Sequence, residues 1–148
     1  MALPIDPSRI SQADIGEKSM EIDLSHEAAI EQVRDICIEE GFGVPVEFSP
    51  AELLNDKINA ERDPIYVLGA CNPQIADRCL DVTPRLASLF PCNFIIREVE
   101  PGRQEIHHVS IMRIARLVGI APDSPEWDDI VEETGELVEK TYERLQSI

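Results

Sequence analysis

The sequence predicts an α+β protein: an antiparallel β-sheet of about five strands backed by helices, in a β-α-β4-α arrangement with short extra helices. The clearest observation is a hairpin, since residues 92–100 and 103–112 are apolar segments joined at the turn Glu100-Pro101-Gly102-Arg103. Proline and glycine at the two central positions specify a tight turn. The helical segments are set apart from this pair of strands, which favours α+β over a doubly wound parallel sheet.

A single domain is expected for a chain of 148 residues, a length that can bury a core of useful size. Residues 1–17 show no periodic pattern and contain Pro4, Pro7 and Gly16. They are predicted to form a flexible N-terminal arm, which leaves residues 18–148 as one α+β domain.

The first half of the domain is predicted to alternate strands and helices, at residues 18–24, 26–40, 42–48 and 50–60. Ser25 and Ser49 stand where helix N-caps are expected, and Gly41 stands where the first helix ends. Pro45 cannot donate a hydrogen bond to a neighbouring strand, so it places the second strand at a sheet edge or a bulge.

The second half is predicted to contain strands at 65–70, 92–100 and 103–112, and helices at 73–82, 85–90, 112–119 and 124–145. Asn72, Thr83 and Ser124 are the expected N-caps of three of these helices. Gly135 lies within the last helix and weakens it by about 1 kcal/mol relative to alanine. We therefore expect that turn to pack closely against another segment.

The formal net charge of −16 arises from 29 acidic and 13 basic residues. Nucleic acids and anionic membranes require a cationic surface, so neither is an expected partner. Such a carboxylate-rich, lysine-poor chain is typical of a halophilic protein whose stability rises with salt; an acidic mesophilic protein is the alternative. The first residues lack a secretory signal and no apolar run is long enough for a membrane helix, so a cytoplasmic location is expected.

Four cysteines occur at irregular spacings without a CxxC motif, so neither a disulfide framework nor a zinc ribbon is predicted. Cys37 and Cys79 fall on the apolar sides of predicted helices and are expected in the core. Cys71 ends a strand, and Asn72 and Pro73 begin the next helix, whose free N–H groups point back toward the thiol. Such a position lowers the pKa of a thiol, so Cys71 is predicted to be the most reactive of the four.

Cys92 and Asn93 open the following strand, just after Pro91. If the two strands are neighbours in the sheet, the thiols of Cys71 and Cys92 lie at one rim. Three interpretations stay open: small residues that fill tight corners, a thiol redox or sulfur-transfer pair, and a soft-metal site completed by His108.

The segments “EEGFGV”, “LGACNP” and “LFPCN”, followed by the hairpin, resemble the family catalogued as domain of unknown function 302. The resemblance covers about residues 19–110, and the combination of “GACNP” with “PCN” is its most specific part. It implies a fold similar to the TATA-binding-protein-like class and a homodimer. It implies no agreed activity and no particular cofactor.

The sequence therefore predicts a cytoplasmic, homodimeric binding or carrier module for a small ligand or partner. No Ser/His/Asp order, glycine-rich phosphate loop or HExxH motif is present, which argues against a hydrolase or a kinase. The alternative function is that of a thiol redox or sulfur-transfer protein acting through Cys71 and Cys92.

Overall fold

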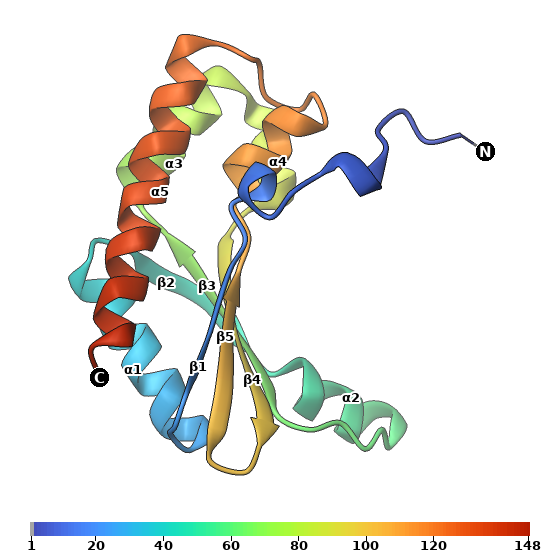
Figure 1. Ribbon diagram of the computed structural model, residues 1–148, viewed down its shortest axis with the longest axis vertical. Helices are drawn as coiled ribbons and strands as arrows, with labels where there is room; N and C mark the ends of the chain where they lie inside the picture. The colour runs from blue at the N-terminus through green and yellow to red at the C-terminus, as the bar shows by residue number, and fades with distance from the viewer. Residues whose placement is uncertain (1) are drawn as a thin grey trace.

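The computed structural model describes residues 2–148, and within them one antiparallel sheet has the strand order β1-β5-β4-β3-β2 (Figure 1). The strands are β1 (Lys18–Ile22), β2 (Gly43–Phe48), β3 (Ile65–Cys71), β4 (Cys92–Glu100) and β5 (Arg103–His108). The α-helices are α1 (His26–Glu39), α2 (Pro50–Ile58), α3 (Pro73–Val82), α4 (Ile111–Leu117) and α5 (Pro125–Gln146). The predicted α+β class is confirmed.

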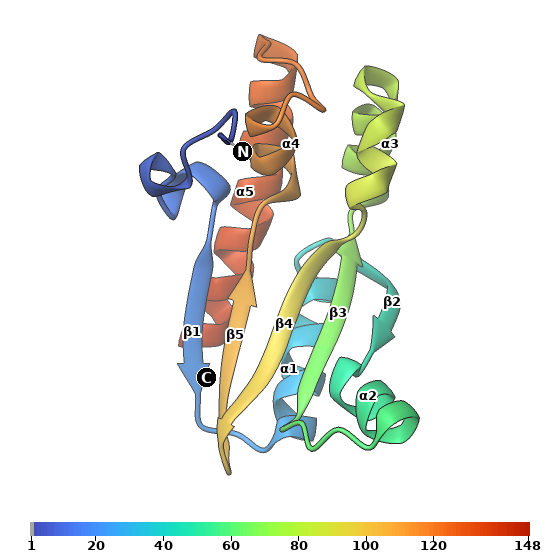
Figure 2. The same cartoon turned by 90° about the vertical axis from the view of Figure 1, so that its right-hand side faces the viewer.

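The helices occupy distinct places around the sheet (Figure 2). Helices α1 and α5 cover one face, whereas α3 and α4 lie beyond the end at which β3 ends and β4 begins. The short helix α2 projects from the opposite end, next to the edge strand β2. No helix of residues 2–148 lies over the middle of the other face of the sheet.

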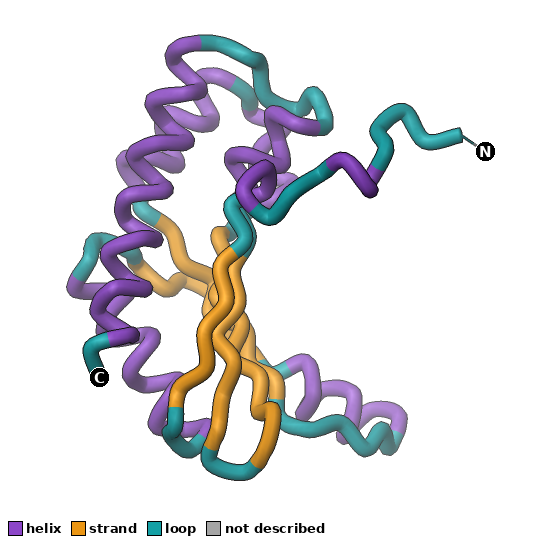
Figure 3. The backbone as a smooth tube through the Cα atoms, in the orientation of Figure 1, coloured by secondary structure: helices purple, strands orange, loops and turns teal. Residues whose placement is uncertain are grey.

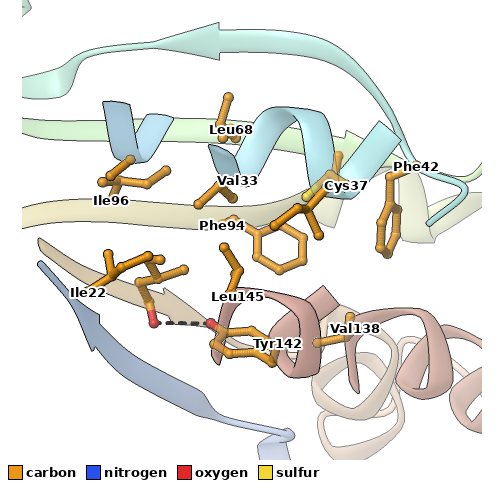
Figure 4. Packing of buried hydrophobic residues seen from close by; sticks show 14 residues of the cluster. Ile22, Val33, Cys37, Phe42, Leu68, Phe94, Ile96, Val138, Tyr142 and Leu145 are labelled. Carbon is orange, nitrogen blue, oxygen red and sulfur yellow. Dashed lines mark hydrogen bonds between the residues drawn. The ribbon is translucent and has the colours of Figure 1, made fainter. Parts of the chain in front are cut away.

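One apolar core lies between the sheet and helices α1 and α5 (Figure 4). The Phe94 ring packs edge-on against Phe42, with 5.9 Å between ring centroids, and stacks on His108 at 4.7 Å. The Tyr142 hydroxyl donates a hydrogen bond of 3.1 Å to a main-chain carbonyl of β5, which ties α5 to the sheet. Cys37 is fully enclosed here, as predicted.

A second core lies where α3, α4 and the first half of α5 meet. The indole N–H of Trp127 donates to the main-chain carbonyl of Met112 at 2.9 Å. Cys79 is also enclosed, with its Sγ 3.7 Å from the Sδ of Met112. Helix α5 contributes buried side chains to both cores and so joins them.

Most of the local sequence signals are confirmed. Each of the following N-cap side chains accepts a hydrogen bond from the main chain of the first helical turn: Ser25, Ser49, Asn72 and Ser124. Strand β2 is an edge strand, and its register shifts between Gly43 and Val46, on either side of Pro45. The missing N–H of Pro45 accounts for both features.

Two local predictions are wrong. Thr83 occupies the N-cap position of the following 3₁₀ helix, as predicted, but its side chain does not cap it, because the hydroxyl instead donates to the main-chain carbonyl of Ile120 at 3.0 Å. Gly135 is not in close contact with another segment, because a Cβ built there meets nothing within 4 Å. This turn of α5 faces open space.

The segment before β1 lies beside α4 (Figure 3). Its second 3₁₀ turn is Ala13–Ile15. The carbonyl of Ile15 accepts a main-chain hydrogen bond of 2.8 Å from the Ser110 N–H. The carboxylate of Glu17 lies 2.8 Å from the Nε2 atom of His107. These contacts attach residues 13–17 to the domain. Residue 1 of the predicted N-terminal arm lies outside the described residues.

Candidate functional site

The structure brings Cys71 and Cys92 to the same end of the sheet. Strands β3 and β4 are antiparallel neighbours, and the register pairs Ala70 with Cys92, so the conditional prediction of two thiols at one rim is met. Asn72 caps α3 by accepting from the N–H of Ile75 at 3.0 Å, while its amide nitrogen donates to a main-chain carbonyl before β2. Pro73 is the first residue of α3.

The thiols at this end are protonated at neutral pH. Burial raises the pKa of Cys71, and burial raises that of Cys92 to about 12, with smaller contributions from Cys71 and Cys79. The predicted lowering of the Cys71 pKa is therefore wrong. The physical reason is that Asn72 already occupies an N–H group of the helix end, so desolvation of the thiol dominates.

The space beside these cysteines is small. The cavity lined by Cys71, Cys92 and apolar neighbours has a volume of about 20 Å³, which is room for roughly one water molecule. It cannot contain an organic ligand. The arrangement matches the packing interpretation of the two cysteines, in which small side chains fill corners.

The structure does not unite the cysteines with His108. Within residues 2–148, no three His, Cys, Asp or Glu side chains lie close enough together to hold a metal ion. Cys71, Cys92 and His108 therefore do not form the predicted soft-metal group. His108 lines a different and much larger cavity, and Thr134 of α5 borders both.

That larger cavity has a volume of about 460 Å³, within the range of small-molecule sites. It lies where the start of β1, the end of β5, α4 and the middle of α5 meet. Ala13, Gly16 and Glu17 form one wall. Gly135 lies on another wall, where the absence of a side chain leaves the space open.

His108 forms the buried end of this cavity, with only 2% of its surface exposed. Its Nδ1 lies 2.8 Å from the main-chain carbonyl oxygen of Asn93 and must donate to it, because a carbonyl can only accept. Burial lowers the pKa of His108 to about 4, so the ring is neutral at physiological pH. The neutral tautomer therefore carries its proton on Nδ1 and a lone pair on Nε2.

The Nε2 atom of His108 is the unusual group in this site. Every fully enclosed side-chain nitrogen or oxygen in residues 2–148 has a hydrogen-bond partner. Nε2 has none, so it is reached from the cavity that the ring lines. An acceptor that is held in one tautomer and faces a cavity without a protein donor is suited to receive an N–H or O–H group of a ligand.

Two other large hollows lack such a group. The hollow of about 600 Å³ near α2 contains Arg34, which is bound to Glu47 together with the hydroxyl of Tyr66. The hollow of about 540 Å³ beside β1 contains the ion pair of Lys18 with Glu139. Their principal polar groups already bind one another, so neither hollow offers a buried free acceptor.

The family model for the domain of unknown function DUF302 matches residues 18–145, almost the whole chain. The chain belongs to the DUF302 family. The crystal structure of an uncharacterised conserved DUF302 protein from Bacillus stearothermophilus has the same fold, with a TM-score of 0.74 and 23% sequence identity over 86% of this chain and 96% of that one. Among curated proteins, none matches the chain.

Sequence reasoning found only part of the site in this DUF302 domain. It named His108, but as a partner of the cysteines, and it named Asn93, whose main-chain carbonyl rather than side chain fixes the imidazole. It missed Arg113 and residues 13–17, because no sequence motif joins them to β5. The glycine in the middle of α5 was the one available signal.

No helix of residues 2–148 meets the length and apolarity that a bilayer crossing requires.

Alkylation of the native DUF302 domain should modify Cys71 before the other three cysteines. Cys71 is half-buried, whereas Cys37, Cys79 and Cys92 are buried, so access decides the order. Because the pKa of Cys71 is raised, the reaction should be slow near neutral pH and accelerate as the pH increases. Limited alkylation followed by peptide mass mapping measures this order. Faster modification of Cys79 or Cys92 would contradict it.

Proposed function

We propose that this DUF302 domain is a binding or carrier module for a small ligand, which it holds in the cavity that ends at His108. The observation that carries the proposal is the free Nε2 of a buried, neutral imidazole at the end of a cavity of about 460 Å³. Because Nε2 opens onto the cavity, a ligand that donates to it exchanges contact with solvent for a hydrogen bond inside the protein, worth about 0.5–1.5 kcal/mol.

His108 is better suited to binding a ligand than to catalysis. A general base works best when its pKa lies near the working pH. Burial lowers the pKa of His108 to about 4, which makes the imidazole a weak base that accepts a hydrogen bond rather than removing a proton. The packing of Phe94 against the ring fixes its orientation further.

The test is a screen of chemically diverse small molecules by thermal stabilisation, because a ligand that binds only the folded state raises the melting temperature. The substitution Gly135→Leu would fill the cavity from its open wall, and it should abolish stabilisation by the compounds that bind the wild type. Lys140→Leu lies outside the cavity on the same helix and should leave stabilisation unchanged. Equal responses of both variants, or no stabilising compound, would refute the proposal.

We also propose that the domain acts as a homodimer in the cytoplasm, where its four free thiols stay reduced. The support for the dimer is strand β2, an edge strand on which Val46 and Phe48 are 53% and 46% exposed. An edge strand can pair with its own copy about a two-fold axis, so one surface serves both subunits. Light scattering of the wild type and of a Val46→Lys, Phe48→Lys double variant tests this; a wild-type mass of about 17 kDa, that of one chain, would exclude the dimer.

A further inference from the structure

We infer that the ligand of the His108 cavity is a small protonated amine. This inference rests on the proposed binding function and names the chemical class of the ligand. It follows from two independent features of the cavity: the free acceptor at its buried end and the unpaired carboxylates at its rim.

The buried end accepts and does not donate. His108 Nδ1 is committed to the carbonyl of Asn93, and Nε2 carries only a lone pair. A carboxylate or phosphate oxygen of a ligand would meet another acceptor there and be repelled. An ammonium group has N–H donors and fits this position.

The rim carries two carboxylates without partners. Glu132 and Glu136 lie one turn apart on α5, on either side of the open space at Gly135. Neither makes a salt bridge or a side-chain hydrogen bond within residues 2–148. Like charges four residues apart on a helix repel each other, so a bound cation would relieve this repulsion.

Two further carboxylates around the cavity have side-chain contacts. Lys18 pairs with Glu139, and the carboxylate of Glu17 contacts His107.

Arg113 also lines the cavity, and it makes no ion pair within residues 2–148. Four carboxylates line the cavity, those of Glu17, Glu132, Glu136 and Glu139, against the two cations Lys18 and Arg113, so the formal charge of the lining is −2.

In this arrangement the buried end of the cavity supplies a hydrogen-bond acceptor and the rim supplies negative charge. One N–H of a primary ammonium donates to Nε2 of His108, and the carboxylates of Glu132 and Glu136 supply charge balance toward the opening. The absence of a side chain at Gly135 gives the body of the ligand its space. No bond is made or broken, so the site selects by hydrogen bonding and charge alone.

Three probes of the same shape test the class: cyclohexylamine, cyclohexanol and cyclohexanecarboxylate. Titrations followed by NMR should give an affinity for the amine at least tenfold higher than for the alcohol, and still weaker binding of the carboxylate. The amine should also shift the ¹⁵N resonance of His108 Nε2. The double variant Glu132→Gln, Glu136→Gln should lose at least tenfold in amine affinity with little change for the alcohol.

The control has the same change in net charge elsewhere on α5: Glu126→Gln, Glu143→Gln. An equal loss of amine affinity in this control would assign the effect to overall charge and overturn the inference. Equal binding of all three probes would also overturn the inference. So would a screening compound whose binding is lost in Gly135→Leu, if the amine itself does not bind; in that case the cavity would remain a binding site for another class of ligand. If no probe and no screening compound binds, the proposed function fails as well.

Discussion

Gly69→Ala is expected to destabilise the domain by about 3 kcal/mol, which corresponds to a fall of roughly 10 °C in melting temperature for a domain of this size. Gly69 lies in the interior strand β3. A Cβ at this position would meet the Cγ of Pro91 at 2.6 Å and the main-chain carbonyl oxygen of Val46 at 2.9 Å. Because one obstacle is backbone and the other a proline ring, neither can turn aside as a flexible side chain would. Chemical denaturation followed by circular dichroism measures the change.

The matched control is Gly135→Ala, in which the added methyl group meets nothing within 4 Å. Alanine favours a helix interior over glycine by about 1 kcal/mol, so this variant should be more stable than the wild type. Opposite signs for the two substitutions would establish that local space decides their effects. A loss below about 1 kcal/mol for Gly69→Ala would show that the edge strand β2 moves aside, contrary to the expected rigidity of this corner.

Acidification should remove about 3 kcal/mol of stability through His108 alone. Its pKa is about 4 in the folded protein and near 6.5 as a free side chain, and a difference of one pKa unit is worth about 1.4 kcal/mol. In the unfolded chain His108 binds a proton near pH 6.5, whereas in the folded protein it binds this proton only near pH 4. The full stability is therefore present above pH 6.5 and is lost progressively as the pH falls toward 4.

The measurement is the free energy of unfolding as a function of pH for the wild type and for His108→Gln. Carboxylates titrate in both proteins, so the difference between the two curves isolates the histidine. That difference should change by about 3 kcal/mol between pH 6.5 and 4. Parallel curves for the wild type and His108→Gln would contradict the buried, neutral state of the ring.

The sequence by itself determined the α+β class and most of its elements, because the signals that specify them act over a few residues. Pro101 and Gly102 favour the turn between β4 and β5 through their own backbone conformations, without help from distant residues. The serines at 25, 49 and 124 cap helices through hydrogen bonds to N–H groups three residues on. Pro45 marks an edge strand because it lacks an N–H group.

The tertiary structure alone decided the chemistry of the side chains, because burial and neighbours come from segments distant in sequence. Cys71 lies at a helix start, yet desolvation raises its pKa, and only the packing around β3 reveals which effect dominates. Likewise, the tautomer of His108 depends on Asn93 of β4, and the cavity that its ring lines depends on Gly135 and on the residues before β1. No local pattern connects these segments, so the site exists only once the sheet and helices have brought them together.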